Sequence, residues 1–267
     1  MGRLDFEVIK EKITRKSKRA NTASEKPARD AVELTLMSYN TQHCLNYRTR
    51  KIDYQMVADT IKKCGADIVG LQEIRNKSDA EGYDAQAKII AHKLGFYYYF
   101  AEAIRFSGKN PYGNALLSRY PIISAETILI PDPKFKIYPG YYETRCILKA
   151  KIDVKGAILN VLVTHLGLNP NEHRKGVRTI LSNLEKKNCV LIGDFNMKPH
   201  NKKLRPIKER LYDTAEKFSA PKLSFPSDNP KHKIDYIFTS RDLKILSADI
   251  PPIVSSDHRP HIATLEF

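Results

Sequence analysis

Alternating apolar and polar positions, together with short apolar runs, divide most of the chain into regular elements. Such patterns are typical of strands, and they predict strands at 33–39, 67–72, 113–118, 122–130, 144–152, 157–164, 189–193, 234–239, 245–248 and 262–267. Apolar residues at helical spacing predict helices over 53–64, 84–94 and 172–186. Strand–helix–strand order near both ends, with hairpins between, predicts two packed sheets with helices on their outer faces.

The first part of the chain differs from the rest. Residues 1–31 are charged, and their few large apolar side chains roughly follow one helical face: Leu4, Phe6, Val8, Ile9 and Ile13. Residues 16–30 have the Lys-, Arg-, Ser- and Ala-rich composition of a solvated linker. We therefore expect a basic N-terminal extension over 1–31, with a short helix and a linker, and one domain over 32–267. A basic arm that touches nucleic acid or membrane is the alternative to an inert extension.

The charge balance changes this picture of an ordinary globular protein. The chain has 45 Lys and Arg residues against 30 Asp and Glu residues, a formal net charge of +15. An excess of positive charge favours polyanionic partners, which include nucleic acid, anionic membrane surfaces and phosphorylated small molecules. The charge does not choose among these classes, and a basic housekeeping protein without such a partner stays open.

The cysteine pattern and the hydropathy of the chain indicate the cellular compartment in which we expect the protein. No two of the 4 cysteines form a C-x-x-C pair, and their spacing matches no zinc pattern: Cys44, Cys64, Cys146 and Cys189. Single thiols in apolar segments are typical of reduced, structural cysteines. The N-terminus lacks the apolar core of a secretory signal, and no apolar run reaches the length of a membrane span. We therefore expect a soluble, cytoplasmic protein.

Polar side chains end several of the predicted strands. Any one of them alone fits a turn former, a helix cap or a structural histidine. Together they suggest a site, because strand ends on the same side of a sheet converge, and converged carboxylates repel one another without a cation. The residues are Asn40, Glu73, His165, Asp194, Asn196, Asp235, Asp257 and His258.

The residue types at these strand ends also indicate the metal. Carboxylate and amide oxygens, with no thiolate among them and few imidazoles, suit Mg²⁺ or Mn²⁺ better than Zn²⁺. A hard cation among oxygen ligands stabilises the charge that grows on phosphoryl oxygens during hydrolysis. An imidazole beside a carboxylate can then move the proton of an attacking water.

These residues, in this order, resemble the endonuclease/exonuclease/phosphatase superfamily, which is also called DNase I-like. The resemblance extends over residues 40–258, and its most specific parts are Gly193-Asp194-Phe195-Asn196 and Ser256-Asp257-His258. It implies an α/β fold: a four-layer sandwich in which two packed, mostly antiparallel β-sheets are flanked by helices. It also implies an active site in the cleft between the sheet edges, in a small member of bacterial type.

The resemblance assigns metal binding to three residues. Glu73 would be the main ligand, with Asn40 and Asp257 near the ion, either directly or through water. The cofactor would be Mg²⁺ or Mn²⁺, and whether one or two ions act is left open.

The resemblance further assigns catalytic and substrate-side roles. His258, oriented by Asp235, would act on the attacking water or bind the scissile phosphate, and Asp194 would align or deprotonate that water. Asn196 and His165 would hydrogen-bond the phosphoryl oxygens. Further substrate-side candidates are Asn114, Arg145 and Arg174, although a surface ion pair explains Arg145 equally well.

Departures from better-known members bear on the substrate. Abasic-site endonucleases have an acid two residues after the first Asn, where this chain has Gln42, and they use tryptophan-containing segments, whereas this chain has 0 Trp. Inositol 5-phosphatases carry a W-C-D-R-type segment where this chain has His232-Lys233-Ile234-Asp235. The segment after His165 resembles small members with poorly defined substrates. Some of these are similar to a eukaryotic domain linked to glycolipid-anchor remodelling, so lipid head groups stay in view.

Three functions remain open from the sequence. A nuclease or nucleic-acid phosphodiesterase is favoured by the net charge and by basic residues beside the motifs: His173, Arg174, Lys175, Arg178, Lys231, His232 and Lys233. The alternative is an enzyme acting on phospholipid head groups or small phosphate esters, with the basic surface against an anionic membrane. A non-catalytic binding module is the third. No obligate protein partner is evident.

Overall fold

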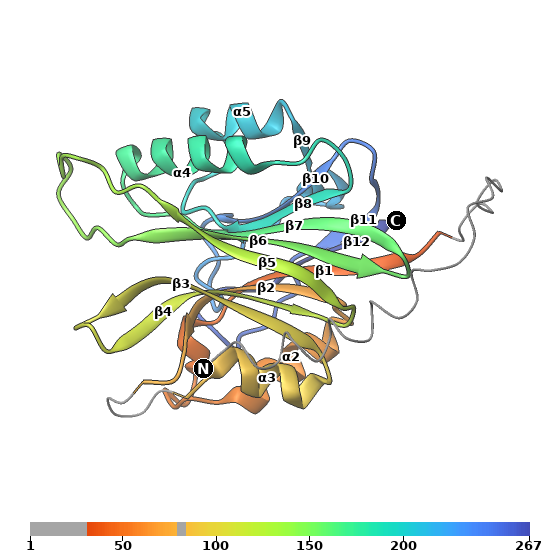
Figure 1. The fold of residues 1–267 in the computed structure, drawn as a ribbon, viewed down its shortest axis with the longest axis horizontal. Coiled ribbons are helices and arrows are strands. Elements are labelled where there is room, and N and C mark those ends of the chain that lie inside the picture. Colours follow the sequence, from red (N-terminus) through yellow and green to blue (C-terminus); the bar gives the residue numbers. More distant parts are fainter. Residues whose placement is uncertain (1–30, 79–83) are drawn as a thin grey trace, which may run out of the picture. The chain divides into compact units, whose positions relative to one another are not determined.

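Two six-stranded β-sheets pack against each other, with helices on both outer faces (Figure 1). The computed structural model describes residues 31–78 and 84–267. The predicted extension over 1–31 falls almost wholly outside these residues and stays a prediction. From Val32 to Phe267 the chain forms one compact unit, whose four layers confirm the predicted α/β sandwich.

The first sheet has the strand order β11-β12-β1-β2-β4-β3. Its strands are β1 (Glu33–Asn40), β2 (Ile68–Arg75), β3 (Tyr97–Phe106), β4 (Asn110–Ser118), β11 (Lys244–Asp249) and β12 (His261–Glu266). The second sheet has the order β5-β6-β7-β8-β10-β9. Its strands are β5 (Ile122–Ile130), β6 (Arg145–Val154), β7 (Ala157–His165), β8 (Cys189–Asp194), β9 (Leu211–Asp213) and β10 (Asp235–Ser240).

Each sheet contains one parallel pair among antiparallel neighbours. β1 lies parallel to β2, and β7 lies parallel to β8. A parallel pair needs a crossover connection, and helices supply it: α2 (Tyr54–Lys63) between β1 and β2, and α4 (Pro170–Asn183) between β7 and β8. All other pairings in the two sheets are antiparallel, as predicted.

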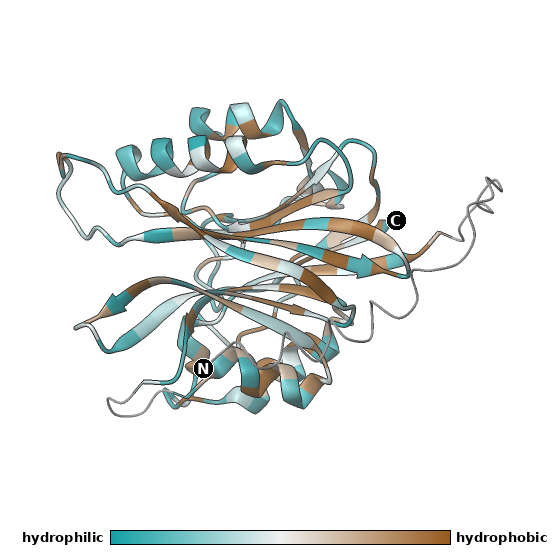
Figure 2. Cartoon of the chain, in the orientation of Figure 1, coloured by the Kyte–Doolittle hydropathy of each residue, from teal (hydrophilic) through white to brown (hydrophobic). Residues whose placement is uncertain are grey.

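Apolar side chains form three clusters between the layers, and Figure 2 shows the hydrophobic residues along the strands and helices that contribute to them. Between the sheets, Leu36 and Ile68 pack in one cluster with Val163 and Ile192. The outer face of the first sheet packs on α2 and α3 (Gln86–Leu94), and that of the second packs on α4 and α5 (Arg205–Lys208). Short 3₁₀ helices complete the elements: η1 (Gln42–Cys44), η2 (Lys202–Leu204) and η3 (Thr214–Lys217).

Hydrophobic periodicity missed three elements. β3 is an edge strand whose side chains are mostly exposed or half-buried, so it lacks the alternation that marks a strand with one buried face. β9 and α5 are too short, at 3 and 4 residues, to show any period. The helix predicted over 172–186 begins earlier, at Pro170, because Asn169 and Glu172 form a capping box there.

Candidate active site

The two parallel strand pairs end at the same site. In the first sheet Asn40 is in register with Gln72, and in the second His165 is in register with Asp194. The Asn40 side chain connects the sheets, because its Nδ2 donates to Oε1 of Glu73 at 3.0 Å and to Oδ2 of Asp194 at 3.2 Å. The strand ends therefore converge, as the sequence pattern predicts.

Glu73 lies in an irregular part of β2. The pairing of β2 with β4 shifts register between Leu71 and Ile74, and Glu73 has a φ of 60°. A residue other than glycine rarely adopts a positive φ, and bulges often redirect a side chain beside an active site. Asn196, just after β8, also has a positive φ, of 51°. Both sheets thus have residues in the left-handed region near the site, and the first sheet also has them just after β1, at 42–44.

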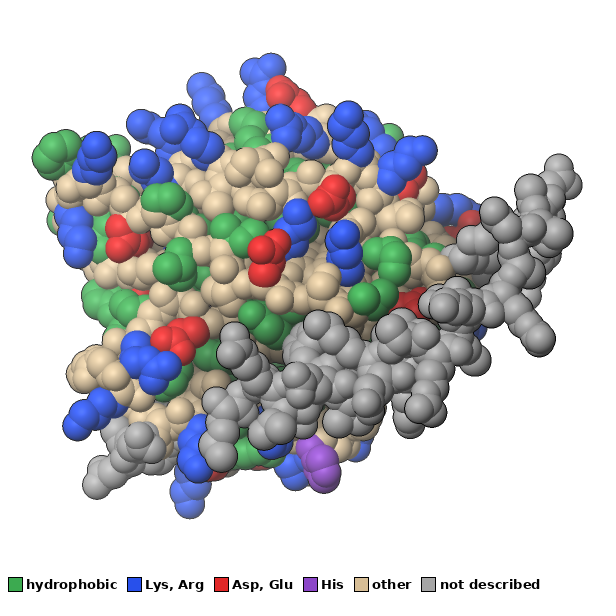
Figure 3. Space-filling view, viewed as in Figure 1, with side chains coloured by type: hydrophobic (Ala, Val, Ile, Leu, Met, Phe, Trp, Pro, Cys, Tyr) green, Lys and Arg blue, Asp and Glu red, His purple; other side chains and the backbone are tan. Residues whose placement is uncertain are grey.

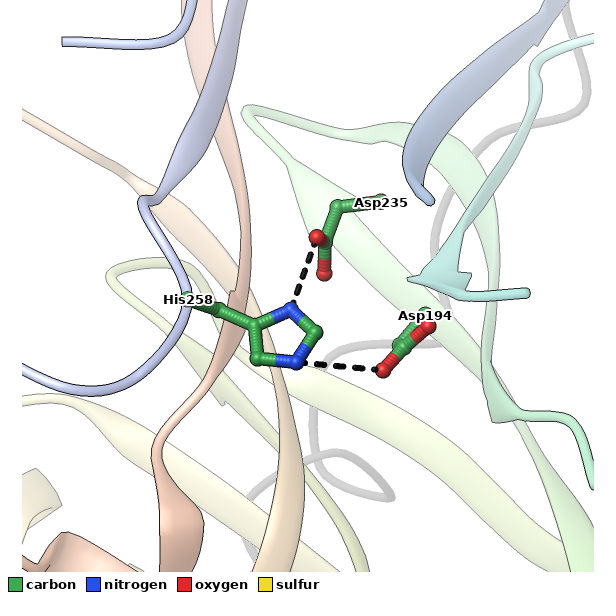
Figure 4. Close-up of side chains that lie close together, drawn as sticks. All are labelled: Asp194, Asp235 and His258. Carbon is green, nitrogen blue, oxygen red and sulfur yellow. Dashed lines mark hydrogen bonds and ion pairs between the residues drawn. The ribbon is translucent and has the colours of Figure 1, made fainter. Parts of the chain in front are cut away.

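His258 lies between two carboxylates (Figure 4). Its Nδ1 is 2.9 Å from Oδ2 of Asp235, and its Nε2 is 3.7 Å from Oδ2 of Asp194. Both carboxylates are buried. The hydrogen bond that Nδ1 donates to Asp235 fixes the orientation of the ring, which directs Nε2 towards Asp194.

The charges of this cluster depend on one another. Burial raises the pKa of Asp194, and the neighbouring Asp235 carboxylate raises it further. Burial by itself would lower the pKa of His258, but the carboxylates of Asp235 and Asp194 outweigh this effect and raise it. His258 is therefore cationic at neutral pH, and Asp194 has a greater proton affinity than an exposed aspartate. A carboxylate of this kind is suited to accept a proton from water.

His165 approaches Asp194 from the other side. Its Nε2 is 3.5 Å from Oδ2 of Asp194, and its Nδ1 is 3.0 Å from Nη1 of Arg145. Burial and the Arg145 charge lower the pKa of His165 well below its ordinary value, so the ring is neutral. Because a guanidinium only donates, Nδ1 must accept, and the ring proton resides on Nε2, facing Asp194.

Arg145 forms a buried ion pair with Glu143, with 3.1 Å between Nη2 and Oε2. The side chains are only 10% and 8% exposed, so the alternative of a surface ion pair is wrong. Glu143 was not among the functional residues expected from the sequence. Its separation from Arg145 by one residue, just before a predicted strand, was the available signal.

Asn196 and Gly193 shape the loop after β8. The Asn196 backbone N–H donates to Oδ1 of Asp194 at 2.9 Å, and its side-chain Nδ2 donates to the carbonyl of Leu166 at 2.9 Å while lying 3.2 Å from Nε2 of His165. A Cβ at Gly193 would lie 2.3 Å from the carbonyl oxygen of Thr164. Glycine at this position therefore allows β7 and β8 to bring His165 and Asp194 together.

The segment before β10 supports the loop that carries Asp257 and His258. Ser227 Oγ donates to the Ser256 carbonyl at 2.6 Å, and the Ser227 N–H donates to the Asp257 carbonyl at 2.7 Å. The Phe225 ring lies 4.7 Å from that of His258. These supporting residues had no recognisable pattern in the sequence, because their partners lie about thirty positions away.

Glu73 lies near the carboxylate of Asp257, and both supply the oxygen donors that a hard cation prefers. Burial raises the pKa of Glu73; the Asn40 hydrogen bond opposes this, and the Asp257 carboxylate raises the pKa further. Oε2 of Glu73 lies 3.9 Å from Nδ1 of His43, and burial lowers the pKa of His43. The Asn40 amide and the His43 ring, which contact this carboxylate, do not carry a full positive charge, and oxygen donors suit Mg²⁺ or Mn²⁺.

A second group of ligands lies beside the first. Ligand atoms of Asp194, Asp235 and His258 lie within 4.8 Å of one another and could hold a metal ion if His258 released a ring proton. Oδ1 of Asp235 is buried without a hydrogen-bond partner among the described residues. The residues present therefore fit a divalent cation, and the ligand assignment to Glu73, Asn40 and Asp257 stays a prediction. Asn40 directs its amide nitrogen at the carboxylates, while its oxygen accepts from the Gln42 N–H at 3.1 Å.

The remaining substrate-side candidates lie in different surroundings. Asn114 is buried, and its Nδ2 donates to the Cys146 carbonyl at 3.1 Å. Arg174 is exposed on α4, where it lines a groove with Phe135 and Ile137. Of the basic residues beside the motifs, His173 and Lys233 are buried, so these two do not contribute to a cationic surface.

A comparison of the sequence with protein families gives one match. Residues 37–258 match the model of the Endonuclease/Exonuclease/phosphatase family. The chain belongs to this family. Its members are typically hydrolases that act on phosphate esters, and the match includes every catalytic and metal-ligand candidate named above.

Solved structures of similar fold come from bacteria and from human. A mannosyl-6-phosphatase from Bacteroides thetaiotaomicron VPI-5482 has a TM-score of 0.70 at 19% identity, covering 88% of this chain and 100% of that chain. An endonuclease/exonuclease/phosphatase from Beutenbergia cavernae DSM 12333 has a TM-score of 0.69 at 20% identity, covering 88% and 72%. The human Nocturnin catalytic domain has a TM-score of 0.66 at 17% identity, covering 88% and 96%. At these identities the likeness establishes the fold.

A curated protein also matches part of the chain. Protein cwh43 of Schizosaccharomyces pombe is 28% identical over 111 residues, which are 42% of this chain and 10% of that protein. The match thus spans about a tenth of the length of that relative.

Proposed function

We propose that the protein is a metal-dependent phosphoric ester hydrolase in which a water molecule attacks phosphorus in line with the leaving oxygen. The observation that carries this proposal is the position of Asp194. Its Oδ2 faces His258, His165 and the Asn40 amide at 3.7, 3.5 and 3.2 Å. A carboxylate so surrounded is held in one orientation while it receives a proton.

Five side chains take part in the proposed reaction. Asp194 aligns the water and accepts its proton, for which its raised pKa suits it. Cationic His258, held by Asp235, binds a non-bridging phosphoryl oxygen and stabilises its growing charge. Neutral His165 directs its one ring proton, on Nε2, at Asp194, and the Asn196 amide beside it is available to hydrogen-bond the phosphoryl group. Bringing these groups to one point lowers the entropic barrier to attack.

Glu73 and Asp257 would hold a divalent cation, with Asn40 between Glu73 and Asp194. When bound, a hard cation acts as a Lewis acid that stabilises charge on phosphoryl oxygens. Mg²⁺ or Mn²⁺ is the proposed ion, since the donors are oxygens.

Nucleic acid is the substrate class that the net charge of +15 favours. Cationic surfaces bind phosphate backbones with an affinity that falls steeply as salt increases. The test is Mg²⁺-dependent nicking of supercoiled plasmid by the wild type and by His258→Ala. Salt-sensitive nicking by the wild type alone would support a nuclease. Absence of nicking by either protein would reject nucleic acid and leave the reaction class to be tested with small phosphodiesters and phosphomonoesters.

A phosphate ester carried by a lipid is the second candidate. The observation that favours it is a group of exposed apolar side chains beside basic ones on the loop that leads into β6. The compartment, which we expect to be the cytoplasm, stays a prediction. Among the described residues, no helix is long and apolar enough to cross a membrane.

A further inference from the structure

The loop between β5 and β6, residues 131–144, exposes large apolar side chains. Phe135 is 75% exposed, Ile137 69% and Tyr141 60%, and Leu168 on the adjacent loop is 58% exposed. We call residues 131–144 the rim loop. Isolated exposed apolar residues are common, but a group of this kind usually marks an interaction surface.

Polar contacts hold the rim loop so that these side chains stay outside. The Asn169 side chain donates to the Tyr141 carbonyl at 3.0 Å, and the Asn171 side chain donates to the Phe135 carbonyl at 3.0 Å. Asn169 also caps α4, so the loop backbone is attached to the start of that helix. The loop therefore has a defined position, although its large apolar side chains are not buried in the core.

Basic side chains surround the apolar ones. Lys134, Lys136 and Arg174 are exposed, and a groove of about 290 Å³ is lined by Pro133, Lys134, Phe135, Ile137, Asn171, Arg174 and Lys175. The nearby acids are already engaged, since Asp132 accepts from Thr144 and Glu143 pairs with Arg145. Figure 3 shows hydrophobic and basic side chains together at the left edge, where Figure 1 places this loop.

The rim loop lies at the end of the sandwich that carries the candidate active site. It leads directly into Arg145, the first residue of β6, which contacts His165. A small pocket there is lined by residues from both ends of the loop together with Arg145 and Leu166. A surface that engages the rim loop would therefore be close to the catalytic residues.

We propose that the rim loop docks on a membrane surface containing anionic phospholipid. Phe135, Ile137 and Tyr141 enter the boundary between head groups and acyl chains, while the surrounding lysines and Arg174 contact lipid phosphates. Aliphatic side chains favour this partner over nucleic acid, because Ile137 and Leu168 have no ring on which a base could stack. That the docked enzyme acts on a lipid-borne phosphate ester rests on the proposed function; docking itself does not.

The test is sedimentation of the full chain with vesicles of phosphatidylcholine, with and without phosphatidylserine. The variant Phe135→Ser/Ile137→Ser should bind the anionic vesicles at least about tenfold more weakly than the wild type, because less apolar area enters the interface. The matched control Ile123→Ser/Ile158→Ser removes two exposed isoleucines from strand ends remote from Arg145. It should bind within about twofold of the wild type. Lys134→Ser/Lys175→Ser should reduce the preference for phosphatidylserine.

Each outcome decides the docking proposal independently of catalysis. Vesicle binding by the inactive variant His258→Ala, lost on adding Phe135→Ser/Ile137→Ser, would support docking even if every phosphoester assay failed. Equal vesicle binding by the rim-loop variant and the wild type would overturn it. Loss of binding to a fluorescent single-stranded oligonucleotide, with vesicle binding intact, would assign the loop to nucleic acid instead. Thermal unfolding midpoints of all variants check that the fold is retained.

Discussion

The two sheets share one strand arrangement around a parallel pair but bring different chemistry to the site. The order β12-β1-β2-β4 in the first corresponds to β6-β7-β8-β10 in the second, with the parallel pair in the same place. The ends of the parallel strands carry Asn40 and Glu73 in one sheet, and His165 and Asp194 in the other. The same backbone arrangement thus presents an amide and a carboxylate on one side, and an imidazole and a carboxylate on the other.

The surroundings of the two carboxylates explain the difference. The Glu73 side chain is 23% exposed, and the Asp257 carboxylate raises its pKa by repulsion. The Asp194 side chain is 2% exposed and lies between two imidazoles. Each carboxylate has an acidic neighbour, but the more accessible Glu73 is proposed to bind a cation, whereas Asp194, between two imidazoles, is proposed to accept a proton. Fold symmetry therefore does not determine function at equivalent strand ends.

The largest effect on activity is expected from variants that distinguish the proton-accepting role of Asp194 from the cation-binding role of Glu73. Asp194→Asn should lower kcat by about a thousandfold at every Mg²⁺ concentration, because it removes the group that accepts the proton of the water. Glu73→Gln should also be slow at low Mg²⁺ but should recover activity as Mg²⁺ is raised. Initial rates on bis(4-nitrophenyl) phosphate across a Mg²⁺ titration measure both.

The two variants serve as controls for each other, since each replaces a carboxylate by its amide. Recovery of Asp194→Asn by excess Mg²⁺, or no recovery of Glu73→Gln, would contradict the assignment of the cation to the first sheet. Circular dichroism establishes that both proteins fold.

A smaller effect is expected from the ion pair behind His165. Glu143→Gln should lower kcat by about tenfold, because Arg145 loses the partner that directs it at Nδ1 of His165. A merely structural role for Glu143 is tested with His165→Ala. If Glu143 acts through His165, adding Glu143→Gln to His165→Ala should lower kcat little further.

The control for Glu143→Gln lies in the first sheet. Glu102→Gln removes an acid paired with Arg105 on β3, where the side chains are 46% and 38% exposed. Exposed ion pairs contribute little, so this variant should retain its rate. Equal losses in both variants would refute a special role for the Glu143–Arg145 pair.

The smallest effect concerns stability, to which each sheet contributes a buried neutral histidine. Burial holds the pKa values of His261 on β12 and His165 on β7 well below 6.5. The unfolded chain takes up these protons near pH 6.5, so the folded state loses stability as pH falls below that value. Each such group contributes about 1.4 kcal/mol per pH unit.

His261→Gln should therefore reduce the slope with which the free energy of unfolding falls as pH is lowered, whatever its effect at neutral pH. Urea unfolding with a chelator present, compared above and below pH 6.5, measures this. A slope equal to that of the wild type would mean that His261 is protonated in the folded protein or that its ring is not a source of acid sensitivity.

Local patterns account for the parts of the fold and site that the sequence predicted. Burial alternates along β12 and at the start of β1, where every second side chain faces the core, and this property is visible in neighbouring residues. The Asp194–Asn196 turn and the Ser256–Asp257 pair are also local, since their hydrogen bonds join residues two or fewer positions apart. The family resemblance then supplied roles for these residues that no spacing could give.

Two kinds of feature could not be predicted from the sequence. The edge strand β3 has no single buried face, so its residues lack a strand period. The rim loop has an ordinary mixture of apolar and basic residues, and only its attachment to Asn169 and Asn171 leaves the apolar ones in solvent. Burial of a side chain depends on what packs against it, which the neighbouring sequence does not record.

By itself, then, the sequence determined the two-sheet sandwich, the convergence of polar strand ends and the membership of a phosphoesterase family. Only the tertiary structure decided that Asn40 bridges Glu73 and Asp194, which is 154 positions away, and that Arg145 is buried against His165. The physical reason is that strand periodicity arises from local burial, whereas these contacts arise where two sheets meet. Their partners are chosen by packing geometry, and distance along the chain carries no information about that geometry.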